Sequence, residues 1–167
     1  MTPDKATMLL GMYTQDVAQE AQTTRKVIAA IPEDKVDWAP HEKNMSAIDL
    51  AWHLASTEIW FLDGIVAGAF NMGDGKRPEN IKTVADVLAY YDANLGPSLE
   101  KAKAISGEAA AQIVDFFGAF QLPAVAYLGF LVKHSVHHRG QLSTYLRPMG
   151  GKVPSIYGGS ADEPFMG

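Results

Sequence analysis

Apolar side chains recur at the spacing of an α-helix in four long stretches of the chain. The first stretch covers residues 4–31 and stops at Pro32, which cannot continue a helix. The second begins after Ser46, a suitable N-cap, and runs from Ala47 to Phe70. The pattern therefore predicts two long amphipathic helices in the first half of the chain.

The second half repeats the pattern twice. Thr83 can cap a third helix over residues 83–102, with Asp86 three positions after it. Residues 106–122 mix a short Ala-rich stretch with apolar and aromatic side chains, and we assign no element to them. Pro123 suits the first position of a fourth helix, because proline lacks the N–H that is unpaired there anyway.

Four amphipathic segments with connections of moderate length predict an all-α protein, a four-helix bundle whose apolar faces meet in a shared core. The tail from Gly150 to Gly167 is rich in Gly and Pro, so we expect it to be irregular. The 167 residues and 47% hydrophobic content match the size and core of one domain. We therefore predict a single domain spanning residues 1–167.

Composition argues against several classes of function. Lys and Arg total 14 against 19 Asp and Glu, and no basic cluster is present, so we expect no nucleic-acid partner. The chain has no cysteine, so a metal would have to bind to His or carboxylate side chains. The N-terminus lacks a basic stretch ahead of an apolar one, and the longest apolar run is too short to cross a bilayer. We expect a cytoplasmic protein without membrane association.

Two histidines of the fourth predicted helix could bind one ion. His134 and His138 lie one turn apart, about 40° around the axis at ~3.6 residues per turn. The apolar stripe of this helix passes through both positions, so we expect both imidazoles to face the core. Burying two unpaired imidazoles without a ligand would be costly, although a hydrogen-bonded core histidine is the ordinary alternative. Spacing alone allows His137 to replace either of them.

A third imidazole is predicted to face the same core. His53 follows Leu50 by three residues and precedes Thr57 by four, within the inward stripe of the second helix. A lone histidine there would be typical of a hydrogen-bonded core residue. Three protein nitrogens beside an open position are, however, the pattern of reactive rather than structural zinc-like sites. We expect one divalent metal ion, zinc or nickel first, although copper and iron also accept imidazole.

Other side chains carry weaker signals. We interpret Trp52 and Trp60 as packing residues rather than parts of a substrate site. Glu58 is assigned to a face of the second helix away from its apolar stripe. Glu20 lies near the inward side of the first helix, and we interpret it as a solvated side chain rather than as an acid or base. Three methionines are interpreted as core fillers: Met8, Met12 and Met45.

Several segments resemble the DinB/YfiT-like family of metal-dependent proteins, over nearly the whole chain. The stretch at residues 38–41 reads WAPH and looks like the entry to the family's second helix. The segment around His53 reads LAWHL and looks like the one that bears its first histidine ligand. The block from His134 reads HSVHHRGQ and is similar to its final helix. The resemblance implies a metal held by His53, His134 and His138, and leaves His137 outside the ligand set.

Members of that family with an assigned activity include transferases and isomerases that use low-molecular-weight thiols such as bacillithiol, mycothiol or glutathione. The resemblance therefore implies a thiol S-transferase in which the metal holds the cofactor sulfur as thiolate, ready to attack an electrophilic small-molecule substrate. Metal-assisted hydrolysis is one alternative, which a carboxylate base near the metal would favour. A non-catalytic, stress-related metal-binding or ligand-binding module is another. The resemblance also implies a homodimer.

Overall fold

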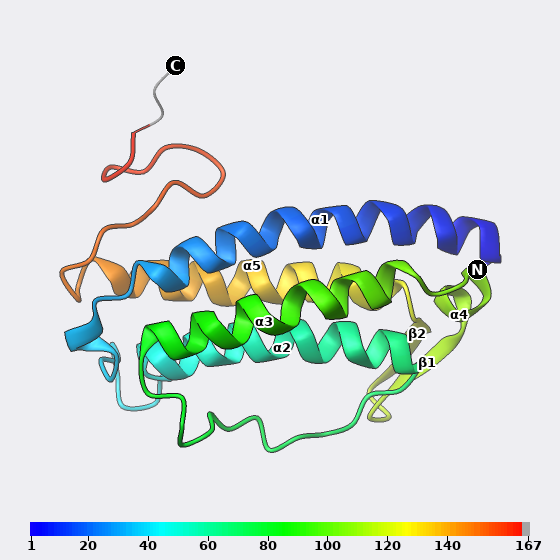
Figure 1. Ribbon diagram of the computed structural model, residues 1–167, viewed down its shortest axis with the longest axis horizontal. Helices are drawn as coiled ribbons and strands as arrows, with labels where there is room; N and C mark the ends of the chain where they lie inside the picture. Colours follow the sequence, from blue (N-terminus) through cyan, green and yellow to red (C-terminus); the bar gives the residue numbers. More distant parts are fainter. Residues whose placement is uncertain (165–167) are drawn as a thin grey trace.

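The computed structural model describes residues 1–164, and four long helices dominate it (Figure 1). These helices are α1 (Pro3–Ala29), α2 (Ala47–Ala67), α3 (Val84–Lys103) and α5 (Ala126–Leu146). They lie lengthwise against one another, with α2 packed against both α3 and α5 and α1 packed against α3 and α5 (Figure 1). The predicted all-α four-helix bundle is confirmed.

Two of the predicted helix starts are confirmed in atomic detail. The Ser46 hydroxyl accepts a hydrogen bond from the backbone N–H of Asp49 at 3.3 Å, which caps α2. Thr83 and Asp86 form a reciprocal capping box at the start of α3: the Thr83 hydroxyl accepts from the Asp86 N–H, and the Asp86 carboxylate accepts from the Thr83 N–H. These contacts fix where the two helices begin.

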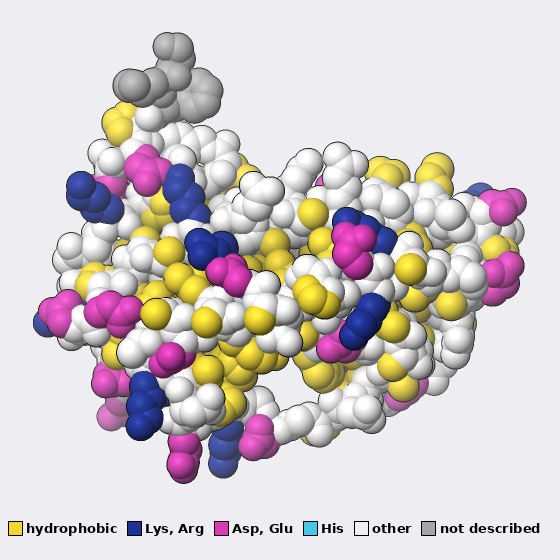
Figure 2. All heavy atoms as spheres, viewed as in Figure 1, with side chains coloured by type: hydrophobic (Ala, Val, Ile, Leu, Met, Phe, Trp, Pro, Cys, Tyr) yellow, Lys and Arg dark blue, Asp and Glu magenta, His cyan; other side chains and the backbone are white. Residues whose placement is uncertain are grey.

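The second helix ends earlier than predicted, at Ala67 rather than Phe70. Gly68 adopts a left-handed conformation with φ of 66°, which a residue without Cβ adopts easily and which stops the helix. Residues 69–82 then form a long irregular connection back to α3 (Figure 1). Figure 2 shows an opening between this connection and the helices.

The region without an assigned element contains a short helix, α4 (Gly107–Ala111), and a two-stranded antiparallel hairpin of β1 (Ile113–Phe116) and β2 (Phe120–Pro123). A one-turn 3-10 helix, η1 (Glu33–Lys35), also lies between α1 and α2. The prediction that Pro123 opens the last helix is wrong. This proline is the end of β2, opposite Ile113, and α5 begins at Ala126.

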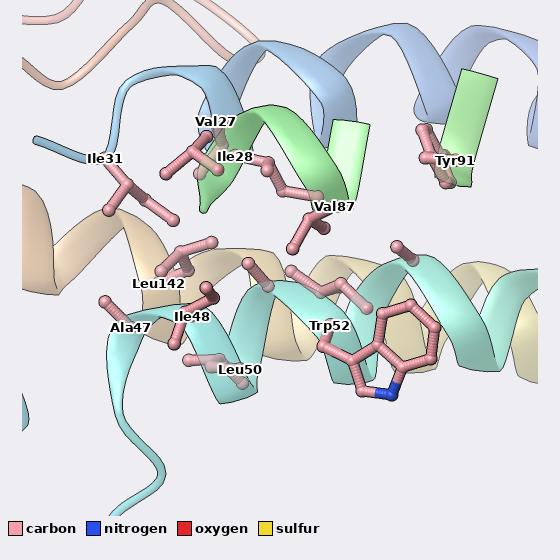
Figure 3. Packing of buried hydrophobic residues seen from close by; sticks show 14 of the residues in the cluster. Val27, Ile28, Ile31, Ala47, Ile48, Leu50, Trp52, Val87, Tyr91 and Leu142 are labelled. Atoms are coloured by element: carbon pink, nitrogen blue, oxygen red, sulfur yellow. The ribbon is translucent and has the colours of Figure 1, made fainter. Parts of the chain in front are cut away.

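The core draws apolar side chains from all four long helices. Figure 3 shows Val27 of α1, Ile48 of α2, Val87 of α3 and Leu142 of α5 around a common interior, and none of them is more than 1% exposed. Burying each such side chain contributes about 1.5–3 kcal/mol. The packing therefore fixes α2 against α5, the two helices that carry the three candidate histidines.

The core also contains a polar network that the sequence pattern assigned to solvent. Glu58 is 2% exposed and accepts hydrogen bonds from Thr24, at 3.1 Å, and from the Tyr91 hydroxyl. Arg139 is 1% exposed, donates to the Glu20 backbone carbonyl at 3.0 Å and forms an ion pair with the Glu20 carboxylate. The assignment of Glu58 to an outer face and the interpretation of Glu20 as solvated are wrong, because partners on other helices compensate these polar groups for the loss of water.

The three methionines interpreted as core fillers are exposed instead, Met8 by 62%, Met12 by 58% and Met45 by 44%. On α1 the buried stripe passes through residues such as Ala6 and Thr14, and Met8 and Met12 lie beside it.

No helix within residues 1–164 combines the length and apolar character needed to span a bilayer.

The tail is irregular through residue 164, as predicted, and residues 165–167 lie outside the described part of the chain. Ion pairs still attach it to the bundle, between Lys26 and Glu163 at 2.6 Å and between Arg147 and Asp162 at 3.1 Å. The Tyr157 hydroxyl donates to the Glu20 carboxylate at 2.7 Å. The tail therefore packs against the end of the bundle where α1 and α5 meet.

Candidate metal centre

The structure brings the three candidate histidines together from two helices. His53 lies in α2, and His134 and His138 lie one turn apart in α5. Each offers one ring nitrogen, and these nitrogens all lie within 4.8 Å of one another. The Nε2 atoms of His53 and His134 are 3.1 Å apart. Since 81 residues separate these two positions, only the packing of α2 on α5 creates the cluster.

Neighbouring side chains orient two of the three rings. The Nδ1 of His138 donates to the Gln141 side-chain oxygen at 2.7 Å, so its Nε2 is the nitrogen without a proton. The Nδ1 of His53 lies 3.4 Å from the Thr57 hydroxyl, one turn further along α2. These contacts are of the kind that fix the tautomer and orientation of metal-binding imidazoles.

His137 does not join the cluster. Its side chain is exposed, although its ring centroid lies 4.8 Å from that of His138. Helical geometry explains the difference, because adjacent residues of a helix point about 100° apart around its axis. The structure therefore separates His137 from His134 and His138, which the spacing alone did not.

The cluster lies at the edge of the core rather than inside it. We expected the apolar stripe of α5 to pass through His134 and His138, yet both are half-buried. The fully buried residues of this stretch are Ser135, which follows His134, and Arg139, which follows His138. The imidazoles thus lie between the core and a pocket that reaches the surface.

All three imidazoles favour the neutral state that binds metals. Burial, together with electrostatic repulsion from His138, lowers the pKa of His53 to about 4 and that of His134 to about 3. Burial also lowers the pKa of His138, partly offset by its hydrogen bond to Gln141. At neutral pH each ring therefore offers a lone pair without losing a proton first.

This donor set suits a zinc-like ion. Two nitrogens bound tetrahedrally at ~2.05 Å would lie about 3.3 Å apart, close to the 3.1 Å between His53 and His134. The widest spacing in the cluster, up to 4.8 Å, requires a modest side-chain rotation to close. Within residues 1–164 no carboxylate belongs to the cluster, so three neutral ligands would leave the ion's charge uncompensated.

Two pockets meet at His53. The first, of about 500 Å³, is lined by His53 and His134 together with many aromatic side chains. The second, of about 530 Å³, is lined by His53 together with four charged side chains, those of Asp49, Lys76, Arg77 and Glu79. Trp52 lines both.

Residues that sequence reasoning missed or misjudged form much of the first pocket. Trp52 and Trp60 were interpreted as packing residues, and both also line this pocket. Phe116 and Phe117 belong to the hairpin, which was not predicted, and Lys76 to the irregular connection. No periodic pattern marks such positions, because loops and turns bring them together.

The fold and the site together are those of a helical-bundle protein with a histidine cluster, at the edge of its core, that could hold a metal ion. The chain belongs to the DinB family, whose sequence profile matches residues 4–164. It is 25% identical to the protein YrdA of Bacillus subtilis over 150 residues, which cover 86% of this chain and 85% of YrdA.

Solved structures of similar proteins share this fold. The DinB-like protein YjoA of Bacillus subtilis superimposes with a TM-score of 0.71 at 20% identity, covering 92% of this chain and 96% of YjoA. YfiT from Bacillus subtilis, described as a probable metal-dependent hydrolase with an unusual four-helix bundle topology, gives a TM-score of 0.71 at 15% identity and covers 86% of this chain and 89% of YfiT. At these identities the comparison establishes the fold alone.

Proposed function

We propose that this protein is a metal-dependent thiol S-transferase. In this proposal His53, His134 and His138 hold one divalent ion, zinc or nickel, at which a low-molecular-weight thiol binds as thiolate and attacks an electrophilic small molecule. The observation that carries the proposal is the convergence of three neutral imidazoles beside a pocket of about 500 Å³, with no carboxylate of residues 1–164 in the cluster. The family membership supports the metal site.

The charge of the site favours an anionic, soft ligand. Three neutral nitrogens leave a doubly charged ion uncompensated, and a thiolate matches a zinc-like ion better than water does. When bound, the ion would lower the pKa of the thiol so that it reacts as thiolate. In the transfer, the sulfur forms a bond to the electrophilic carbon, the leaving group departs with its electron pair, and the thiol proton goes to solvent.

The chain's own residues would bind and orient the reactants. Gln141 and Thr57 hold the outer nitrogens of His138 and His53, so that the inner nitrogens stay directed at one point. The aromatic walls of the first pocket would take the place of water around part of a bound electrophile. The second pocket, which also reaches His53, offers the Lys76 ammonium to a carboxylate of a thiol such as glutathione or bacillithiol, whereas Arg77 is already paired with Asp49.

Hydrolysis is the second candidate, because the structurally similar YfiT is described as a probable metal-dependent hydrolase. Activating water would be helped by a nearby carboxylate base. Asp49 lines the second pocket, but it is paired with Arg77 at 2.7 Å, and hydrogen bonding to Ser46 and Arg77 keeps its pKa low despite partial burial. Asp49 is therefore a weak base, but Glu79 also lines this pocket, so hydrolysis stays the second candidate with Glu79 as its base.

The metal assignment is tested by metal analysis of protein purified without an affinity tag. His53→Ala, His134→Ala and His138→Ala should each abolish stoichiometric binding. His137→Ala is the matched control, a histidine of the same helix outside the cluster, and should retain it. Loss of the ion from His137→Ala as complete as from His138→Ala would contradict the assignment.

The reaction is tested with cobalt bound in place of the native ion. Titration with bacillithiol, mycothiol or glutathione should produce a sulfur-to-metal charge-transfer band and release about one proton per thiol bound. If no thiol at millimolar concentration changes the spectrum while activated esters are turned over, hydrolysis replaces transfer. If neither occurs, the protein is a metal-binding module without this chemistry.

A further inference from the structure

The pocket beside His53 and His134 is walled mainly by aromatic rings. They come from α2, from the β1–β2 hairpin, from α3 and from α5, so elements far apart in the sequence contribute to one surface. The rings are those of Trp52, Trp60, Phe61, Tyr90, Phe116, Phe117 and Phe130. We infer that this pocket binds an aromatic ring of the electrophilic substrate, an inference that rests on the proposed function and names its substrate class.

The rings present both faces and edges. Trp60 and Phe117 are nearly parallel, with centroids 6.3 Å apart and planes 10° apart. Trp60 and Phe116 meet edge to face, at 6.0 Å and 76°. Aromatic ligands gain from such offset-stacked and edge-to-face contacts, on top of what burial of apolar area gives to any ligand. A planar ring therefore uses these walls better than an aliphatic chain of the same size.

Two of these aromatic side chains are only partly buried by the rest of the protein. Phe117 is 40% exposed and Phe130 is 38% exposed, although each contributes to the pocket. Apolar surface left in contact with water beside a cavity is typical of a ligand site. A bound ring would cover this surface, which the bundle itself leaves open.

The charge of the pocket selects among aromatic ligands. Lys76 lines it, whereas no carboxylate does, and Lys76 forms no ion pair with any residue among 1–164. The candidate metal ligands His53 and His134 lie at one side of the same pocket. Both features favour a ring that carries an anionic substituent, which could approach Lys76 or an ion at the histidines.

Binding of defined probes tests the inference without turnover. The probes are 2-naphthoate, the saturated decahydro-2-naphthoate, and the uncharged 2-naphthylmethanol, each followed by calorimetric titration. We expect 2-naphthoate to bind roughly 2- to 10-fold more tightly than its saturated counterpart. Phe117→Ala should remove most of this preference. Ile113→Ala is the control, since Ile113 is a 56% exposed apolar residue of the same hairpin that does not line the pocket.

A second variant tests the charge. Lys76→Gln lies in the irregular connection, outside the helices, and should weaken 2-naphthoate while leaving 2-naphthylmethanol within about twofold of the parent. An equal effect on both probes would overturn the anionic part of the inference. Equal affinity for aromatic and saturated probes, or equal losses in Phe117→Ala and Ile113→Ala, would overturn the aromatic part.

The probes also separate this inference from the proposed function. If the metal proposal fails, protein without an ion should still bind 2-naphthylmethanol in the Phe117-dependent manner, because these walls need no metal. If the pocket inference fails, stoichiometric metal binding and the thiol-dependent cobalt spectrum should persist without any preference for aromatic probes. Each failure thus has its own signature.

Discussion

Replacing Arg139 by Met should be among the most destabilising single changes in the chain. Arg139 is 1% exposed and donates hydrogen bonds to the Glu20 carbonyl at 3.0 Å and to the Thr24 hydroxyl at 3.3 Å, besides its ion pair with the Glu20 carboxylate. Arg139→Met leaves that carboxylate without its charged partner, with the Tyr157 hydroxyl still donating to it at 2.7 Å. Breaking a buried ion pair from one side costs about 3–5 kcal/mol. Because the Glu20 side chain is 19% exposed and can reach water, we expect the lower end, about 3 kcal/mol.

Urea unfolding followed by far-ultraviolet circular dichroism measures this loss. Arg25→Met is the matched control, because Arg25 also makes two contacts of 2.8 Å to one carboxylate, that of Asp92. That pair is exposed, with side chains 50% and 47% accessible, so its loss should cost less than about 1 kcal/mol. The two variants remove the same side chain and the same kind of contact, and differ in burial.

A double variant identifies the cause of the loss. Glu20→Leu combined with Arg139→Met replaces both charges by apolar groups, and we expect it to recover most of the stability, to within about 1 kcal/mol of the parent. If Arg139→Met costs no more than Arg25→Met, burial does not strengthen this pair. If the double variant is as unstable as Arg139→Met alone, the stranded carboxylate of Glu20 is not the cause.

Four further predictions concern the metal site, the core and the assembly. Gln141→Ala frees the Nδ1 of His138 and should weaken metal binding about 10- to 100-fold in chelator competition, whereas Thr144→Ala, an exposed change on the same helix, should not. Chelation should lower the melting temperature by about 5–10 °C without loss of helical signal, since the ion binds the folded state selectively; loss of that signal at room temperature would instead show that folding needs the ion. Burial raises the pKa of Glu58 above its ordinary 4.5, so its contribution to stability is full below that pH and declines as the pH rises through the raised value. Glu58→Gln should lack this decline in unfolding measurements from pH 5 to 8, and a constant difference from the parent would contradict it. Sedimentation at micromolar concentration should show the homodimer that the family resemblance implies, and a monomer would count against it.

The long helices could be predicted because each buries a continuous stripe with the helical period. The hairpin could not, because its strands are four residues long and only Val114 of the first is buried, too little for an alternating pattern to stand out. Pro123 was misplaced because proline fits both the start of a helix and the edge of a strand, and the hairpin that decides between them was not predicted.

The site was predictable in part. Spacing placed His134 and His138 on one face of a helix, and the fold brings His53 to them. Spacing could not show that Arg139 rather than a histidine occupies the buried position, because a charged side chain is assigned to solvent unless its partners are known. Those partners are Glu20 of α1, 119 residues before Arg139, and Tyr157 of the irregular tail.

The three histidines come from the second and the last long helix, with 81 residues between His53 and His134. An ion held by all of them, as proposed, would close a loop of that length in a chain that has no cysteine to do so. Its release would have to precede the separation of α2 from α5, so the ion would act chiefly on the rate of unfolding. A bound metal would then serve this protein as a removable crosslink, with a lifetime set by chelators and pH instead of by redox conditions.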